Sequence, residues 1–99
     1  MSQQVSLTSS VRIRDDVLSR DLQSEQVILD LNTGIYFGLD PVGTRIWQLI
    51  QEHQSLQKVL DSMLEEYEVA EAECTHDLLH FVTQMADRGL VEVYNDGSS

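Results

Sequence analysis

The sequence predicts an α+β domain in which a three-stranded antiparallel sheet is followed by three helices. Short runs of β-branched and aromatic residues, separated by turn residues, fill the first half of the chain. Apolar residues at helical spacing fill the second half. Asp40 and Pro41 stand at the junction, a favoured N-cap followed by a residue favoured at the first helical position. This order of elements indicates helices packed on one face of a small sheet.

The three predicted strands lie at residues 16–22, 27–31 and 35–39. The second strand reads "VILDL" and the third "IYFGL", both rich in residues that favour strands. "SEQ" is a plausible first turn, and the second turn, "NTG", ends in Gly34, which is free to adopt a positive φ. Tight turns between short strands predict an antiparallel meander.

The first two predicted helices cover residues 41–53 and 56–67. The first carries Trp47, whose spacing from its apolar neighbours is typical of a core residue rather than of a ligand platform. The second follows Ser55 as an N-cap, although the residue that would complete a capping box is Lys rather than Glu.

The third predicted helix covers residues 71–88 and ends before Gly89, which suits the C′ position. Residues 90–94, "LVEVY", read as a short final strand or as an extended tail packed on the core. The same elements can also be arranged as a winged helix-turn-helix, so the predicted fold class is α+β and winged helix-turn-helix-like.

The length of 99 residues fits one domain, which we place at residues 11–94 between flexible tails at 1–10 and 95–99. The first residues lack the basic and apolar regions of a signal peptide, and no apolar run reaches the length of a membrane span. A single cysteine, Cys74, allows no internal disulfide. These features predict a cytoplasmic protein.

The charge is strongly negative and unevenly distributed. The net charge is −11, and because residues 1–20 carry +1, the remainder carries −12. Such a field repels nucleic acid and anionic membranes, so neither is an expected partner. It either favours a basic partner or serves only solubility.

Cys74, His76 and His80 come closest to a metal-binding set. The two histidines share a helix face, but Cys74 points elsewhere and no fourth ligand is evident. Acidic neighbours of Cys74 would raise its pKa, which disfavours a reactive thiolate. No phosphate-binding loop or nucleophile elbow is present. We therefore predict no catalytic site, no metal and no cofactor.

A winged helix-turn-helix could bind DNA, but a recognition helix needs basic or amide side chains directed at base edges. The second helix offers only Lys58, and the third offers Gln84 and Arg88 among several acids. A DNA-binding regulator is therefore the weakest of the functions that the predicted fold allows.

The third strand, "IYFGL", lacks the charge, proline or bulge that normally protects a sheet edge. Two interpretations are open. The strand is central in the sheet or covered by the third helix, or its edge is kept open to accept an extended peptide by β-augmentation.

The segment "VILDLNTGIYFGLDPVGTRIWQLI" resembles the PqqD-like family. "SLQKVLDSMLEEY" and "HDLLHFVTQMADRGLVEV" are similar to the second and closing helices of that family, so the resemblance covers residues 17–93. It implies a RiPP recognition element, where RiPPs are ribosomally synthesised and post-translationally modified peptides. Such proteins bind the leader of a precursor peptide as an extra strand, over a groove completed by the third helix, and present it to a modifying enzyme.

The stretch "LDLNTGIYFGLD" is similar to the free-standing leader-binding proteins of lasso peptide pathways, which partner a separate leader peptidase. The alternatives are a peptide chaperone in pyrroloquinoline quinone biosynthesis or in another RiPP pathway. The expected partners are a precursor leader and a processing enzyme. An open edge also permits a homodimer when no leader is bound.

The predicted leader-binding residues come from the third strand and from one stripe of the third helix. The stripe is the flank next to a core seam of Leu78, Phe81, Val82 and Met85, and its small residues leave room for a leader side chain. Asp77, Glu73 or Asp87 could pair with basic leader residues. The complete predicted set is Gly34, Ile35, Tyr36, Phe37, Gly38, Leu79, Val82, Thr83, Ala86 and Asp87.

Overall fold

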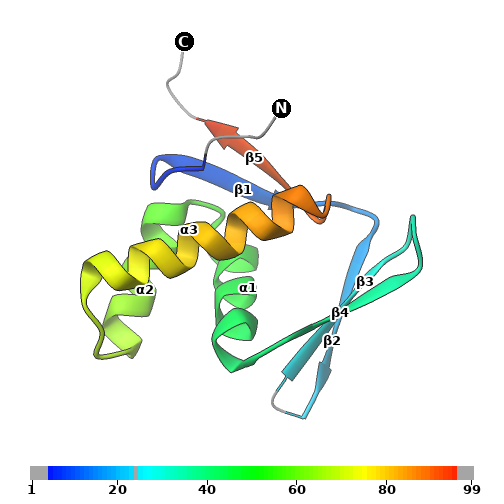
Figure 1. Cartoon of the computed structure of the whole chain (residues 1–99), viewed down its shortest axis with the longest axis horizontal. Helices are drawn as coiled ribbons and strands as arrows, with labels where there is room; N and C mark the ends of the chain where they lie inside the picture. Colours follow the sequence, from blue (N-terminus) through cyan, green and yellow to red (C-terminus); the bar gives the residue numbers. More distant parts are fainter. Residues whose placement is uncertain (1–4, 24, 96–99) are drawn as a thin grey trace.

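The computed structural model describes residues 5–23 and 25–95. Strands β2 (Val17–Leu22), β3 (Glu25–Asp30) and β4 (Ile35–Leu39) form an antiparallel sheet in the order β2-β3-β4 (Figure 1). The predicted meander is confirmed, and the bounds of the first two strands differ by only one or two residues. Gly34 adopts a φ of +73° at the end of the second turn, as the sequence predicts.

The three predicted helices are also present: α1 (Pro41–His53), α2 (Leu56–Glu66) and α3 (Glu71–Asp87). Gly89 has a φ of +75° and donates its N–H to the Ala86 carbonyl, while Leu90 N–H bonds to the Met85 carbonyl, both at 3.0 Å. This pair of bonds closes α3 as a Schellman motif. Ser55 stands at the start of α2 without a side-chain capping bond, consistent with its incomplete capping box.

The Asp40 cap of α1 gives the first testable prediction. Asp40 Oδ1 accepts the Gly43 N–H at 2.7 Å, so Asp40→Ala leaves that donor without its partner. We expect the free energy of unfolding to fall by about 1 kcal/mol. A lower melting temperature in a calorimetric scan would show the loss. Asp40→Asn keeps an acceptor, so its melting temperature should remain close to that of the parent. An equal loss of stability in the Asn and Ala variants would show that the capping bond is not the cause of the loss.

An ion pair joins the first turns of α1 to the end of α2. Arg45 Nε donates to Glu66 Oε1 at 2.8 Å, and this hydrogen bond lowers the pKa of Glu66 below its ordinary value. The pair therefore stabilises the fold above the ordinary glutamate pKa, and its contribution is lost as the pH falls through the lowered pKa. Both side chains are about one-third exposed, so we expect less than about 1 kcal/mol.

Urea midpoints test this pair. Glu66→Gln should lower the midpoint slightly at neutral pH, and this difference should shrink as the pH falls through the lowered pKa of Glu66 and its carboxylate becomes protonated. A difference that stays constant as the pH falls would show that Glu66 acts through packing instead of charge.

A second sheet was not predicted. β1 (Ser9–Ile13) pairs antiparallel with β5 (Val91–Asn95), from Ser9 opposite Asn95 to Ile13 opposite Val91. Of the two interpretations of "LVEVY", the final strand is right. β1 begins inside the segment predicted as an N-terminal tail, and buried Ser9 is already part of it, so ordered pairing starts before residue 11. Residues 1–4 and 96–99 of the predicted tails lie outside the described residues.

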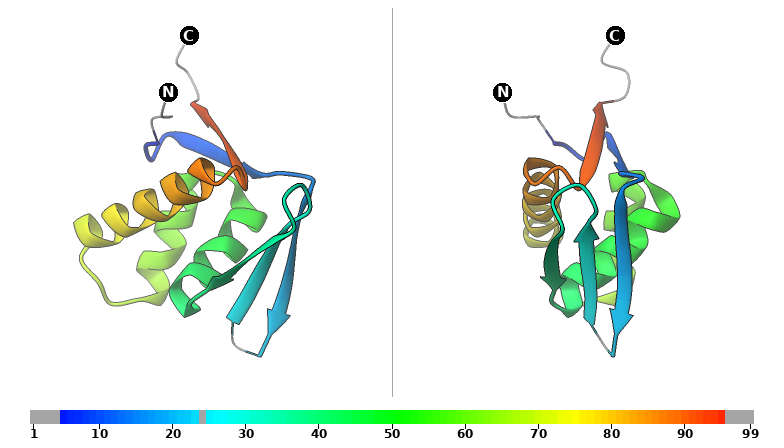
Figure 2. Two further views of the ribbon diagram at one scale, coloured as in Figure 1. Left: turned by 45° about the vertical axis from the view of Figure 1, so that its right-hand side comes forward. Right: turned by 90° about the vertical axis from the view of Figure 1, so that its right-hand side faces the viewer.

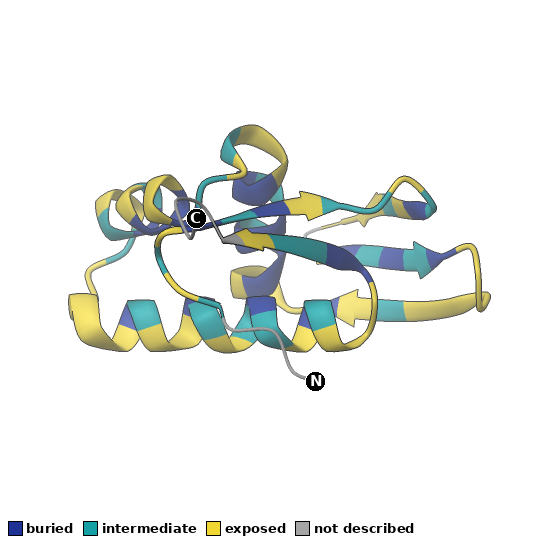
Figure 3. Ribbon diagram, turned by 90° about the horizontal axis from the view of Figure 1, so that it is seen from above, coloured by how far each residue is buried: buried dark blue, intermediate teal, exposed yellow. Residues whose placement is uncertain are grey.

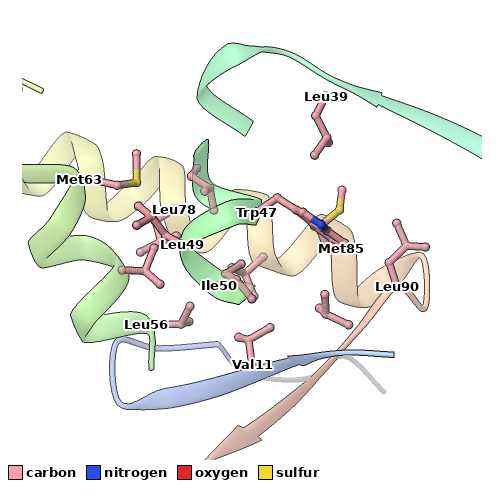
Figure 4. Close-up of a cluster of buried hydrophobic side chains, with 14 of the residues drawn as sticks. Val11, Leu39, Trp47, Leu49, Ile50, Leu56, Met63, Leu78, Met85 and Leu90 are labelled. Atoms are coloured by element: carbon pink, nitrogen blue, oxygen red, sulfur yellow. The ribbon is translucent and has the colours of Figure 1, made fainter. Parts of the chain in front are cut away.

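α1 packs against β3 and β4 of the three-stranded sheet, whereas α2 packs against β1 and α3 against β5, and the core lies between these elements (Figures 1 and 4). Trp47 is 0% exposed at the centre of α1, which confirms its assignment to the core. Side chains from all three helices, both sheets and Leu90 complete the cluster: Val11, Val17, Ile28, Leu39, Ile46, Leu49, Ile50, Leu56, Val59, Leu60, Met63, Cys74, Leu78, Val82, Met85, Leu90 and Val91.

Candidate functional site

β4 is an edge strand of the three-stranded sheet. Its hydrogen-bonded neighbour is β3, and β2 forms the opposite edge. The view onto the sheet shows its three strands side by side, with α3 on the side of β4 (Figure 2, right). Seen from above, the long helix α3 and β4 lie along the same side of the molecule, and most residues of β4 are exposed (Figure 3). The interpretation of "IYFGL" as a central strand is therefore wrong.

A side chain from α1 completes the pairing between β3 and β4. The register places Gln26 opposite Leu39, but the Gln26 N–H donates to Thr44 Oγ1 at 3.1 Å, and the Thr44 hydroxyl donates to the Leu39 carbonyl at 3.4 Å. Gln26 thus directs its N–H toward β4, and Leu39 directs its carbonyl toward β3. From the direction of the Leu39 carbonyl, the directions of the other backbone groups of β4 follow.

Backbone groups alternate in direction along an antiparallel strand. Since Leu39 faces β3, so do Ile35 and Phe37, which lie opposite Asp30 and Ile28. The N–H and C=O groups of Tyr36 and Gly38 therefore point to the open side. Two of the five predicted strand residues thus supply the backbone groups that an added strand would bond.

The side chains of β4 divide between the two faces as the alternation predicts. Leu39 is buried, Phe37 is half-buried, and Ile35 is exposed near the hairpin turn, all on the face toward the helices. The Arg88 guanidinium lies over the Phe37 ring, 5.0 Å from its centroid. Tyr36 is 68% exposed on the other face.

A groove runs from the end of β4 between α1 and α3. It consists of two adjoining cavities of about 170 and 340 Å³, and we call it the β4–α3 groove. Gly43 stands where α1 and α3 approach closely: a Cβ there would lie 3.2 Å from Phe81 Cε1 and 3.1 Å from Asp40 Oδ1, so these side chains would have to shift by a few tenths of an ångström. The lining residues are Gly38, Leu39, Asp40, Val42, Gly43, Ile46, Asp77, His80, Phe81, Gln84, Met85 and Arg88.

The predicted stripe on α3 does not line this groove. At about 100° per residue, Leu79, Thr83 and Ala86 lie roughly 140–160° around the helix from Phe81. Leu79 and Ala86 are half-buried against the core on that opposite flank, and Val82 is 0% exposed within the core. Asp87 is exposed and is not among the lining residues either.

The α3 residues that do line the groove are those at helical spacing from Phe81. Gln84 and Arg88 lie about one and two turns C-terminal to Phe81 in the cavity next to Gly38, and Asp77 lies one turn N-terminal to Phe81 in the larger cavity. Phe81 was predicted to belong to the core seam, Asp77 was predicted as a possible partner of basic leader residues, and Gln84 and Arg88 were considered only for DNA binding. The signal that could have identified this flank is a half-buried aromatic residue flanked by polar residues at i+3 and i+7.

His76, His80 and Cys74 were considered for metal binding and catalysis, and the structure shows the surroundings of each. His76 and His80 stack with ring centroids 6.2 Å apart, and no group of three or more potential metal ligands occurs within residues 5–23 and 25–95. Cys74 is buried, and burial, followed by the charge of Asp77, raises the pKa of its thiol. The direction of that shift agrees with the prediction, but burial is its larger cause. Within the described part of the chain, no helix is long and apolar enough to cross a bilayer.

Comparison with known proteins identifies the family. Residues 25–91, which run from the start of β3 to the start of β5, match the family model described as "Coenzyme PQQ synthesis protein D (PqqD)". The chain belongs to the PqqD family. The resemblance to a PqqD-like RiPP recognition element is thereby confirmed. No curated protein matches this PqqD-family chain significantly.

Two solved structures share the fold of this PqqD-family protein. The first, described as "TbiB1 in Complex with the TbiA(beta) Leader Peptide", is 36% identical, with a TM-score of 0.78 over 89% of this chain and 98% of that one. The second, "Lasso peptide synthetase B1 complexed with the leader peptide", is 24% identical, with a TM-score of 0.77 over 84% and 98%. The predicted α+β fold class is confirmed by this likeness and by the observed order of strands and helices.

Proposed function

We propose that this protein is a non-catalytic, cytoplasmic RiPP recognition element that binds the leader of a ribosomal precursor peptide and delivers it to a processing enzyme, a lasso leader peptidase. The observation that carries this proposal is the outer edge of β4, which pairs with no other described strand and lies beside a groove lined by α3. The relative TbiB1, at 36% identity, is described in complex with a leader peptide, which supports the same role here.

In this proposal the leader adds as a fourth strand. Its backbone bonds to the outward N–H and C=O groups of Tyr36 and Gly38, which give register but little choice of sequence. Its side chains on the helix side enter the β4–α3 groove and supply specificity. Ordering a free leader costs about 2–5 kcal/mol, so a dissociation constant between about 10 nM and 10 μM is reasonable.

The family description favours one second candidate, a peptide chaperone in pyrroloquinoline quinone biosynthesis. The two candidates share the binding mode and differ in the precursor and the partner enzyme. Transfer of leader-bound protein to a purified peptidase, with faster leader removal than by the peptidase alone, would favour the lasso pathway. A homodimer through β4 would compete with either leader and dissociate when leader is added.

The first test is a calorimetric titration of synthetic leaders, taken from short open reading frames beside this gene, into the whole protein. We expect saturable one-to-one binding and no turnover of the peptide. Amide shifts should be largest for Tyr36, Gly38 and the groove residues of α3. Shifts confined instead to Leu79, Thr83 and Ala86 would restore the originally predicted stripe, and the absence of binding to every neighbouring leader would refute leader recognition.

A further inference from the structure

The two ends of the β4–α3 groove carry opposite charge. At the end next to Gly38, Arg88 lines the cavity and lies over Phe37. None of the ion pairs among the described residues involves Arg88, although the protein has a net charge of −11 and many carboxylates. A cation over an aromatic ring beside an unpaired strand edge is available to an incoming carboxylate.

The far end of the groove is acidic around an apolar floor. Asp77 lines only the larger cavity, together with Val42 and Ile46, whereas Asp40 and Phe81 line both cavities. Val42 is 46% exposed although it stands in the first turn of α1, so the floor is open to a ligand side chain. Asp77 makes no ion pair among the described residues, and Asp40 uses one oxygen for the Gly43 N–H. A large apolar side chain next to a basic one is complementary to this surface.

The distance between Asp77 and Arg88 determines how far apart the complementary charges must lie on a bound peptide. Asp77 and Arg88 are eleven residues apart on α3, which corresponds to roughly 16 Å along the helix axis. An extended peptide advances about 3.3 Å per residue, so about five residues separate the positions that meet the two charges. Every ladder among the described strands is antiparallel, which favours the same direction for an added strand.

We propose that the β4–α3 groove selects its peptide by charge order. A Lys or Arg of the peptide meets Asp77, an apolar neighbour fills the cavity floored by Val42 and Phe81, and an Asp or Glu about five residues away meets Arg88. In a strand antiparallel to β4 the basic residue is the N-terminal one. This inference rests on the proposed function and specifies the class of peptide that the site takes.

The test uses a library of random twelve-residue peptides displayed on mRNA and selected on the whole immobilised protein, followed by synthesis of enriched peptides. We expect enrichment of a basic residue, an apolar neighbour and an acidic residue about five positions later. Each enriched peptide is checked for amide shifts at Tyr36 and Gly38. Enrichment of peptides that shift these amides but lack the charge order would overturn the charge selection and leave the proposed function standing. If no peptide shifts these amides, both the charge selection and the proposed function are refuted.

Charge-reversal variants sharpen the test. Asp77→Lys should weaken an enriched peptide about three- to tenfold, and replacing the peptide's basic residue by Glu should restore the affinity. Arg88→Glu should behave in the same way toward the acidic position. Glu65→Lys makes an equal charge change on an exposed residue of α2 outside the groove, and should leave the affinity unchanged at physiological salt. If Glu65→Lys weakens binding equally, or if the peptide with the reversed charge does not restore the affinity, the effect comes from the net charge of the protein, and the proposed charge selection is refuted.

Discussion

Replacing Gly38 by proline should weaken leader binding at least tenfold while the fold stays intact. The Gly38 N–H points away from β3, so its loss removes no bond of the β3–β4 ladder, and proline is tolerated on an edge strand when its missing N–H faces solvent. An added strand would lose one bond and meet the pyrrolidine ring. Calorimetry with a synthetic leader measures the affinity, and circular dichroism measures the fold.

Gly38→Ala is the matched control for this variant. A Cβ at Gly38 has no other heavy atom within 4 Å among the described residues, and alanine keeps the N–H, so affinity should change little. If the proline variant is folded and binds as tightly as the alanine variant, the leader does not pair with β4 at this position.

The largest effect on stability should come from Trp47→Ala. Trp47 is fully buried between α1 and the facing side chains of α3, and truncation of a buried tryptophan typically costs about 3–5 kcal/mol (Figure 4). That is a large part of the stability of a domain of this size. Urea unfolding followed by circular dichroism measures the loss, since the variant has no tryptophan fluorescence.

Trp47→Phe separates volume from hydrogen bonding. Trp47 Nε1 is buried and has no hydrogen-bond partner among the described residues, so phenylalanine removes an unpaired donor together with some volume. We expect the free energy of unfolding to fall much less in the Phe variant than in the Ala variant. Equal losses would show that the indole makes a polar contact that phenylalanine cannot replace.

The elements that the sequence predicted well are those with local signals. Asp40 and Pro41 determine where α1 begins, and Gly89 determines where α3 ends, through hydrogen bonds that span only a few residues. The turn at Gly34 likewise depends on one backbone angle. Each signal lies within the segment that it specifies, so no tertiary information was needed to find it.

The second sheet could not be found in this way. β1 is five residues long, and its partner β5 lies near the other end of the chain, so its pairing depends on where the helices place that end. Serines at its start also resemble a polar tail. Only the tertiary fold brings Val11 and Val93 opposite each other.

The groove residues of α3 were missed for a related reason. The core seam through Leu78 and Val82 has two flanks, and the helical pattern alone does not tell which flank faces β4. The prediction favoured the flank with Leu79, Thr83 and Ala86 because its small residues leave room for a leader side chain. The structure places Phe81 on the other flank, next to Gly43, where the missing side chain lets the two helices approach.

The bridge through Thr44 bears on the cooperativity of unfolding. The amide of Gln26 is held by a hydroxyl that belongs to α1, so its exchange with solvent deuterium requires either the sheet to open or the first turn of α1 to move. Strand and helix therefore share one opening reaction at this position, and we expect the Gln26 amide to exchange as slowly as amides of the helical core. The open edge of β4 is in this way attached to helix α1, whose apolar side chains are buried in the core.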